Sequence, residues 1–316
     1  MSYKSLHFYE IENAIEDSLE EVLRGLIGKQ KMIPPKYFYD EVGSNLFVGI
    51  TEQPEYYLTR TEVDIFRCYL LEIVEEIGTN CLLIEYGSGN SEKIRVLLES
   101  LRPCAYVPLD ISKQYLATAA RSLAKEYPWL QIHAICLDFT DEFELPFSLN
   151  AKRVGFFPGS SIGNFSRLEA ANFLGRVRRL VGEDGGMLIG VDLKKDPIIL
   201  RQAYNDAKGI TRAFNLNVLN HINKKFRADF DINKFEHLAE YQRENGCVAM
   251  YLSSIENQKV NMGGSEISLA CGEQIHTENS HKYSVDEFAS MARESGFSNQ
   301  KVWTDSNTWF GIFYLS

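Results

Sequence analysis

The first eighty residues carry apolar side chains at the spacing of helix faces. One stripe runs through residues 11–27 and is followed by a glycine that acts as a stop signal. A second stripe begins near Thr59 and ends before Gly78, and Glu62 follows Thr59 at the spacing of a capping box. We therefore predict two helices, joined by a loop that is rich in aromatic residues.

From residue 81 onwards, short apolar runs alternate with stretches of helical periodicity. The runs that predict strands are Cys81–Tyr86, Ala105–Leu109, Gln131–Cys136, Val154–Phe157 and Met187–Val191. The helical stretches cover residues 91–101, 112–126 and 167–181. This alternation predicts a parallel sheet that is buried on both faces, with right-handed connections between its strands.

The alternation ends after Leu193. The remaining predicted elements are helices within 197–245, strands at 247–255 and 266–271, a helix at 284–295, and strands at 302–304 and 310–315. We expect an α/β fold with a Rossmann-like, doubly wound core of residues 60–195 plus 281–316. A second, α+β domain would consist of residues 1–59 plus 196–280 and would bind the substrate.

Composition and charge remove several classes of function. The chain has 316 residues, 45% of them hydrophobic, and 43 acidic against 33 basic side chains give a net charge of −10. A nucleic-acid partner is not expected, because phosphate binding needs an excess of Lys and Arg on some face. No stretch reaches the roughly 18 apolar residues of a membrane span, so no membrane association is expected either.

The N-terminus, the cysteines and the histidines together predict a cytoplasmic protein that binds no metal. The N-terminus is acidic and lacks the apolar core of a signal peptide. The six cysteines are scattered without a CxxC pair, which favours reduced thiols. The six histidines show no HExxH spacing, so the sequence predicts no metal site.

Candidate chemistry begins at the end of the first strand of the core, where Gly87 and Gly89 precede a helix. Glycines at this point allow a ligand to approach the backbone at the carboxyl edge of the sheet. A dinucleotide fingerprint would require a third glycine, but that position is Glu92. The loop therefore favours a ligand without a pyrophosphate over NAD(P).

The next two strands end in acids. Asp110 lies about 20 residues after the glycines, where an acid binds ribose hydroxyls. Asp138 can accept a hydrogen bond from an adenine amino group, with Phe139 against the ring. Two acidic strand ends suit a nucleoside that carries positive charge, and S-adenosylmethionine (SAM) is such a ligand.

The fourth strand leads into the loop 157–165, which faces the reacting end of a ligand in a doubly wound fold. Its residues Gly159 and Asn164 permit close backbone approach and a directed hydrogen bond. The loop lacks the Asn/Asp-Pro-Pro-Tyr signature of methyltransferases that act on nucleic-acid bases. The site is therefore expected to act on a small molecule.

Taken together, these motifs resemble the histidine-specific N-alpha-methyltransferases of ergothioneine biosynthesis, which convert histidine into its trimethylated betaine, hercynine. The resemblance extends from about residue 30 to the end of the chain. Its most specific stretches are PPKYFYDEVGSNLF (34–47), PEYYLTRTE (54–62), EYGSGNSEK (85–93), PGSSIGNF (158–165) and FRADFDINKFEH (226–237). It implies a class I SAM-dependent methyltransferase fold, SAM as methyl donor with S-adenosylhomocysteine as product, no metal, and L-histidine as substrate.

The resemblance also assigns the site residues. Its cofactor residues match Tyr56, Gly87, Lys93, Asp110, Asp138 and Phe139. Its substrate residues match Tyr39, Phe47, Tyr56, Gly159, Asn164, Tyr204, Met250, Glu278 and Ser280. By this resemblance, Asn164 and Tyr204 hold the carboxylate and amino end of histidine. Glu278 and Ser280 bind the imidazole in a pocket that Met250 lines.

The catalytic residues expected on this basis are Tyr39 and Asn164. The α-amino group must lose a proton before it attacks, and its pKa of roughly 8 in peptides makes a mild acceptor such as Tyr39 sufficient. The chain departs from the family pattern at Tyr86, Asn90 and Ser161, which affect the shape of the site more than its chemistry.

Three alternatives remain open. A relative of this family could make another betaine, from tyrosine or tryptophan, although an indole or phenol pocket should not need a carboxylate at Glu278. An NAD(P)-dependent oxidoreductase is disfavoured by Glu92, and no feature speaks for a non-catalytic binding protein. We expect a monomer with a small-molecule substrate.

Overall fold

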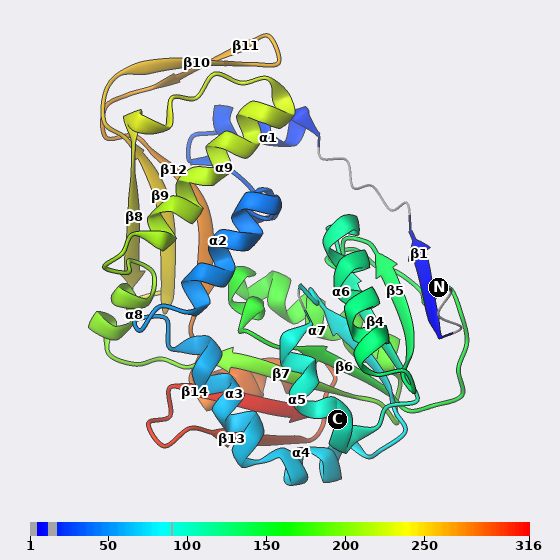
Figure 1. The fold of residues 1–316 in the computed structure, drawn as a ribbon. Helices are drawn as coiled ribbons and strands as arrows, with labels where there is room; N and C mark the ends of the chain where they lie inside the picture. The colour runs from blue at the N-terminus through cyan, green and yellow to red at the C-terminus, as the bar shows by residue number, and fades with distance from the viewer. Residues whose placement is uncertain (1–4, 12–17, 90) are drawn as a thin grey trace. The chain divides into compact units, whose positions relative to one another are not determined.

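The computed structural model describes the chain apart from residues 1–4, 12–17 and 90. The chain divides into two compact units, which are described separately (Figure 1). Unit 1 comprises Met1–Ile15, Leu58–Leu193 and Tyr283–Ser316. Unit 2 comprises Glu16–Tyr57 and Lys194–Lys282.

Unit 1 is built on one eight-stranded sheet with the strand order β1-β5-β4-β3-β6-β7-β14-β13. The strands are β1 (Leu6–Glu10), β3 (Leu82–Tyr86), β4 (Ala105–Asp110), β5 (Gln131–Cys136), β6 (Arg153–Phe157), β7 (Gly186–Asp192), β13 (Gln300–Thr304) and β14 (Phe310–Leu315). Neighbouring strands pair in parallel along the run β1-β5-β4-β3-β6-β7. The last two strands differ, because β14 is antiparallel to both β7 and β13. The predicted doubly wound α/β class is therefore confirmed.

The strand order reverses at β3, whose neighbours are β4 on one side and β6 on the other. The core helices are α3 (Leu58–Cys68), α4 (Leu70–Ile77), α5 (Glu92–Leu101), α6 (Lys113–Glu126), α7 (Arg167–Val181) and α10 (Val285–Glu294). Leu82, Ile84 and Tyr86 pack in one cluster with apolar residues of α7 and α10. Because successive side chains of a strand point to opposite faces, Glu85 faces the other way, toward Ser91 before α5.

The predicted start of the first helix at Ile11 was wrong. Ile11 does not begin a helix, because it directly follows β1, whose five residues pair in parallel with β5. The described part of the predicted stripe contains α1 (Leu19–Ile27), with Ser18 as its N-cap, and residues 12–17, Ile15 among them, lie outside the described residues. A strand at the edge of a sheet has a half-exposed, mixed pattern that local periodicity does not distinguish from a helix.

The single helix predicted near Thr59 is two helices, α3 and α4, which are separated at Tyr69. Because α3 begins at Leu58, Thr59 is inside the helix and cannot act as an N-cap. The carboxylate of Glu62 is fully buried and binds Lys93 and the backbone of Gly159 instead. The predicted capping box was therefore wrong, because tertiary contacts use the same carboxylate.

Unit 2 combines helices with a four-stranded sheet of order β2-β12-β9-β8 and a two-stranded sheet of β10 and β11. Its helical elements are α1, η1 (Pro35–Phe38), α2 (Glu41–Thr51), α8 (Pro197–Ala203), α9 (Ile210–Phe226) and η3 (Ile232–Lys234). Its strands are β2 (Lys31–Met32), β8 (Phe235–Gln242), β9 (Cys247–Ser254), β10 (Gln258–Met262), β11 (Ser265–Leu269) and β12 (Gln274–His281). The helical prediction for 197–245 was wrong over β8, and β10 and β12 were not predicted, because these strands are partly exposed and rich in polar residues.

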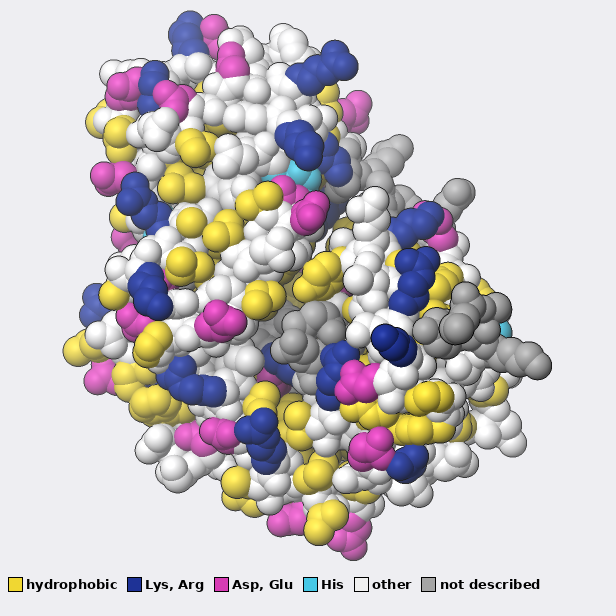
Figure 2. Space-filling model, viewed as in Figure 1, with side chains coloured by type: hydrophobic (Ala, Val, Ile, Leu, Met, Phe, Trp, Pro, Cys, Tyr) yellow, Lys and Arg dark blue, Asp and Glu magenta, His cyan; other side chains and the backbone are white. Residues whose placement is uncertain are grey.

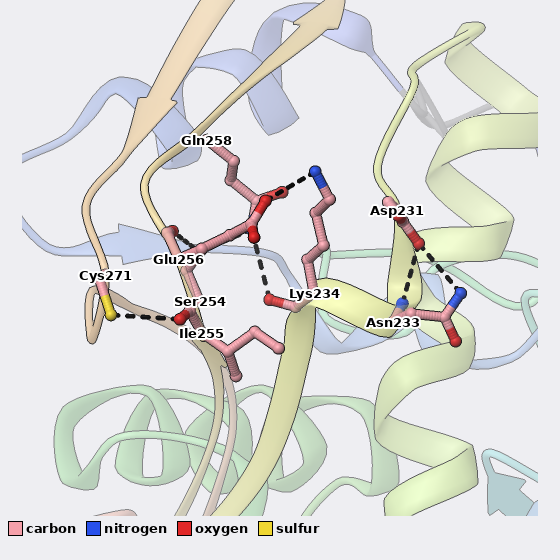
Figure 3. A network of polar contacts seen from close by, with 8 residues as sticks. All are labelled: Asp231, Asn233, Lys234, Ser254, Ile255, Glu256, Gln258 and Cys271. Carbon is pink, nitrogen blue, oxygen red and sulfur yellow. Dashed lines mark hydrogen bonds and ion pairs between the residues drawn. The ribbon is translucent and has the colours of Figure 1, made fainter.

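Polar contacts hold the corner where β8 begins and β9 passes into β10 (Figure 3). The Lys234 ammonium lies 2.7 Å from the Glu256 carboxylate, and the Lys234 carbonyl accepts a hydrogen bond from Gln258. Ser254 accepts from the Gln258 amide at 2.6 Å and donates to the Glu256 carbonyl at 2.7 Å. These hydrogen bonds and the ion pair hold the turn between β9 and β10 against the start of β8.

Charged side chains of both signs are spread over the face of the molecule in Figure 2. On the face in Figure 2, the described Lys and Arg side chains lie interspersed with Asp and Glu. No helix in the described part of the chain has both the length and the apolar character that a membrane crossing requires.

Candidate functional site

The loop after β3 has the backbone geometry of a ligand-binding turn. Gly87 and Gly89 have φ angles of +68° and +52°, which lie in the left-handed region that glycine adopts without strain. A Cβ on Gly87 would lie 3.4 Å from the Phe139 ring. The loop follows the central strand at the point where the strand order reverses, which is where doubly wound folds bind ligands.

Asp110 connects this loop to the end of β4. One carboxylate oxygen accepts a hydrogen bond from the Gly89 N–H at 2.9 Å, and the other accepts from the Ser112 N–H at 2.9 Å. Burial raises the pKa of Asp110, although these two hydrogen bonds act in the opposite direction. The carboxylate is thus aimed at the glycine loop, and each oxygen retains a lone pair for a ligand hydroxyl.

Asp138 and Phe139 follow β5 in the same unit. One Asp138 oxygen accepts from both the backbone N–H and the hydroxyl of Thr140, at 2.9 and 2.6 Å, which leaves the other oxygen for a ligand. The Phe139 ring meets Tyr86 edge-on at 5.9 Å. Tyr86, at which the chain departs from the pattern of the family it resembles, therefore packs against the Phe139 ring.

An ion pair between the partly exposed Lys93 and the buried Glu62 links the two ligand loops of unit 1. The Lys93 ammonium lies 2.7 Å from one oxygen of Glu62, and the other oxygen accepts a hydrogen bond from the Gly159 N–H at 2.8 Å. A Cβ on Gly159, whose φ is +84°, would lie 2.8 Å from the lysine nitrogen. Gly159 and Lys93 are thus held by Glu62, which the sequence reasoning assigned to a helix cap.

The residues of unit 1 fit a positively charged adenosine ligand. Two left-handed glycines leave room for it beside the backbone, and Asp110 and Asp138 each keep acceptor capacity for a ribose hydroxyl or an amino group. Asn164 ends the short helix η2 (Ser161–Asn164) after β6, on the far side of the reversal in strand order. Among the described residues, no group of three His, Cys, Asp or Glu side chains gathers as a metal site would require.

Behind the glycine loop, Glu85 is buried within the sheet. Its carboxylate receives a hydrogen bond from the Tyr106 hydroxyl, which also lies 3.3 Å from Ser91 Oγ. Burial raises the pKa of Glu85 to about 8, and the hydrogen bond from Tyr106 opposes that shift. Folding therefore favours the protonated form of this side chain.

This raised pKa predicts a pH-dependent stability that Glu85→Gln should remove. Because the folded pKa lies above the ordinary value of 4.5, the stabilisation is complete below pH 4.5 and is lost as the pH rises toward 8. We expect the unfolding free energy of the wild type, relative to Glu85→Gln, to fall by on the order of 3 kcal/mol from about pH 5.5 to about pH 8.5. Urea denaturation of both proteins measures this difference, and equal pH profiles would contradict the prediction.

In unit 2, four predicted substrate residues form a continuous series of aromatic contacts. Tyr39 meets Phe47 edge-on at 6.1 Å, Phe47 meets Tyr56 at 6.3 Å, and Tyr56 meets Tyr204 at 6.3 Å. Phe214 of α9 lies 6.0 Å from both Tyr39 and Phe47 and was missed by the sequence reasoning. Such ring faces attract an ammonium group without trapping it.

The series ends at the strands β9 and β12. Glu278 lies opposite Met250 in the register of these strands, and Ser280 follows two residues later on the same face. Glu278 and Ser280 are buried, at 8% and 4% exposure. The Tyr204 and Ser280 hydroxyls lie 2.7 Å apart. The structure thus brings Tyr204 and Ser280 into contact and pairs Met250 with Glu278.

The predicted site residues are divided between the two units. Unit 1 carries Gly87, Lys93, Asp110, Asp138, Phe139, Gly159 and Asn164, and unit 2 carries Tyr39, Phe47, Tyr56, Tyr204, Met250, Glu278 and Ser280. Tyr56, predicted for both ligands, is in unit 2. Lys282, which was not predicted, is a fully buried lysine whose ammonium contacts Tyr204 and Ser280. A lysine two residues after Ser280, which is a predicted site residue, is the sequence signal that could have indicated it.

The chain is similar to proteins of one family over most of its length. The profile of a family described as histidine-specific methyltransferase, SAM-dependent, matches residues 18–316. A histidine N-alpha-methyltransferase of Mycolicibacterium smegmatis is 36% identical over 319 residues, which cover 99% of this chain and 98% of that protein.

Two further relatives extend the comparison. A histidine N-alpha-methyltransferase of Mycobacterium tuberculosis is 36% identical over 299 residues, covering 92% of both proteins. Ergothioneine biosynthesis protein 1 of Neurospora crassa is 32% identical over 298 residues, covering 90% of this chain and 33% of that protein. The profile match and the near full-length identity lead to one conclusion: the chain belongs to the family of histidine-specific, SAM-dependent methyltransferases.

Proposed function

We propose that this protein transfers three methyl groups from SAM to the α-amino nitrogen of L-histidine and so makes hercynine for ergothioneine biosynthesis. The observation that carries the substrate choice is the buried carboxylate of Glu278 with Ser280 on the same strand face. An imidazole offers an N–H donor to the Glu278 carboxylate, and a ring without that donor cannot form this hydrogen bond.

We assign the cofactor to unit 1 and most of the substrate contacts to unit 2. In unit 1, Asp110 would bind the ribose, and Asp138 with Phe139 would hold the adenine. When bound, SAM supplies the methyl group from its sulfonium. Gly159, held by Glu62, would present its backbone at the reacting end, where Asn164 would orient the substrate amine.

The proposed chemistry needs alignment more than charge stabilisation. Charge is only spread between sulfur and nitrogen in the transition state, so the main contribution of the protein is to hold the reacting atoms in line. Tyr39, directly or through a water molecule, would accept the proton of the ammonium. The rings of Tyr39, Phe47 and Tyr56 would leave room for a nitrogen that grows by three methyl groups.

The direct test is incubation of the purified protein with SAM and each of histidine, tyrosine and tryptophan. We expect a mass gain of three methyl groups on histidine and on neither of the other two. Methylation of tryptophan or tyrosine without methylation of histidine would replace the proposed substrate with another amino-acid betaine precursor.

We further propose that the protein works as a monomer in the cytoplasm, on a small molecule, without nucleic acid or membrane. The net charge of −10 and the interspersed surface charges support this proposal. Light scattering coupled to gel filtration measures the oligomeric state, and a mass near 72 kDa in place of 36.1 kDa would contradict the monomer.

A further inference from the structure

His237 of β8 is the last residue of the stretch 226–237, which carries part of the family resemblance but has no part in the proposed site. Its ring connects two helical segments of unit 2. Nδ1 lies 2.8 Å from the amide nitrogen of Asn215 in α9, and Nε2 lies 2.9 Å from the carbonyl oxygen of Tyr204, directly after α8. One imidazole therefore joins α8, α9 and β8.

The side-chain amide of Asn215 determines which ring nitrogen of His237 carries a hydrogen. Asn215 has 0% exposure, and its amide nitrogen also lies 3.0 Å from the Tyr251 carbonyl oxygen. A backbone carbonyl only accepts hydrogen bonds, so the NH2 group must face it, since the reversed amide would bring two oxygens together. The same NH2 group therefore donates to Nδ1 of His237, and Nδ1 carries no hydrogen.

The other ring nitrogen of His237 has the opposite role. The Tyr204 carbonyl can only accept, so Nε2 carries the hydrogen and donates it. Both ends of the ring thus require the same neutral form, with a hydrogen on Nε2 alone. Burial lowers the pKa of His237, although the hydrogen bond to Tyr204 and the Asp206 carboxylate oppose that shift. A second proton on Nδ1 would face the donating nitrogen of Asn215.

The carbonyl of Tyr204 is at the end of a helix. Tyr204 is the C-cap of α8, and the last carbonyls of a helix have no partner within it. After it, the Asp206 carboxylate accepts hydrogen bonds from the first N–H groups of α9, at Ile210 and Thr211. His237 and Asp206 thus both anchor the short segment between α8 and α9.

The Tyr204 side chain extends from this segment to other residues of the proposed site. Its ring lies 6.3 Å from the Tyr56 ring, and its hydroxyl lies 2.7 Å from Ser280 Oγ. Because a side chain moves with its own backbone, loss of the donor to the Tyr204 carbonyl would let this ring and hydroxyl shift. A misplacement of about 1 Å is costly in a site that works by orientation.

We propose that His237 is a positioning residue, which donates from Nε2 to the Tyr204 carbonyl and so holds the Tyr204 side chain where it binds the carboxylate and amino end of the substrate. This inference rests on the proposed function. His237 acts through a residue that contacts the substrate before and during the reaction. Loss of the N–H donor should therefore act more on KM than on kcat.

Two replacements of His237 separate its N–H donor from its shape. Glutamine has about the reach of Nε2 and keeps an N–H donor, whereas methionine has a similar length and no donor. Both lack the ring nitrogen that faces Asn215. We expect His237→Met to raise the histidine KM about tenfold, with kcat within about threefold of the wild type. His237→Gln should stay within about threefold of the wild type in both constants.

The measurements are initial rates at saturating SAM, together with calorimetric titration of S-adenosylhomocysteine. The affinity for S-adenosylhomocysteine should stay within about twofold in both variants, because the proposed cofactor residues of unit 1 are unchanged. Equal histidine KM values for His237→Gln and His237→Met, whether raised or not, would overturn the inference, since the N–H donor would then have no effect.

A matched control replaces another side-chain donor of the same strand. Gln242 of β8 donates from its amide to the Tyr251 hydroxyl at 3.0 Å, and neither residue is part of the proposed site. We expect Gln242→Met to keep the histidine KM within about twofold of the wild type. An increase equal to that of His237→Met would show that any lost contact of β8 has this effect, and the positioning role would be wrong.

Nitrogen-15 NMR of the wild type tests the tautomer without a variant, because it distinguishes a protonated ring nitrogen from a bare one. At about pH 7 we expect a neutral His237 ring with its hydrogen on Nε2. A hydrogen on Nδ1, with or without one on Nε2, would contradict the inference even if neither variant folds. Failure of the proposed function would look different, because the wild type would then leave histidine unmethylated while the His237 tautomer stayed as expected.

Discussion

Replacing Glu278 with glutamine should raise the KM for histidine by about 10- to 100-fold, with a smaller effect on kcat. The side chain is 8% exposed and lies opposite Met250, so a carboxylate there accepts an imidazole N–H with little competition from water. Hydrogen bonds to charged groups contribute roughly 1.5 to 3 kcal/mol, which corresponds to that range of affinity. A neutral amide keeps the volume but weakens the acceptor and adds two donors.

Steady-state kinetics with histidine at saturating SAM measure this effect. SAM affinity should stay within about twofold of the wild type, since the proposed cofactor residues of unit 1 are unchanged. Glu240→Gln is a suitable control, because Glu240 is an exposed carboxylate on β8 of the same sheet. If Glu278→Gln and Glu240→Gln gave the same KM as the wild type, the assignment of the imidazole to Glu278 would be wrong.

The second large effect is expected from Asp110→Ala, which should weaken SAM binding by about 100-fold. The substitution removes the proposed ribose acceptor and also the carboxylate that holds the Gly89 N–H at 2.9 Å. Loss of a charge-assisted bond to the ligand and loss of loop preorganisation both reduce affinity. Asp110→Asn keeps one acceptor oxygen, so we expect its defect to be intermediate.

Isothermal titration calorimetry with S-adenosylhomocysteine separates this binding defect from a defect in turnover. Asp184→Ala, at an exposed turn of unit 1, should bind like the wild type. Circular dichroism spectra should match among the three proteins, because Asp110 is at the end of β4 rather than within its apolar core. If Asp110→Ala bound S-adenosylhomocysteine as tightly as the wild type does, Asp110 would not be the residue that binds the ribose.

The core sheet could be predicted in detail because its strands have a strong, local signal. The five parallel strands from β3 to β7 are short and apolar, and amphipathic helices separate them except between β5 and β6. Their observed bounds differ from the predicted ones by no more than one residue at each end. The edge strand β1 and the polar strands β8, β10 and β12 were missed. Their side chains are partly exposed, so tertiary pairing rather than apolar periodicity decides their conformation.

In the candidate site, too, some features follow from the sequence and others only from the tertiary structure. The sequence by itself determined that Gly87, Asp110, Asp138 and Gly159 lie at one edge of the sheet, because the carboxyl ends of parallel strands meet there. It also carried the motifs that identify the family. These conclusions depend on short-range order, since a strand end and the loop after it are contiguous in the chain.

Only the tertiary structure decided which side chains bond to one another. Glu62 binds Gly159 across 97 residues, and Lys282 binds Tyr204 across 78. In the sequence, Glu62 satisfied the pattern of a helix cap, and Lys282 was one charge before the helix predicted at 284–295. Burial removes both from water, and a buried charge must find its partners wherever the fold brings them, which local periodicity does not encode.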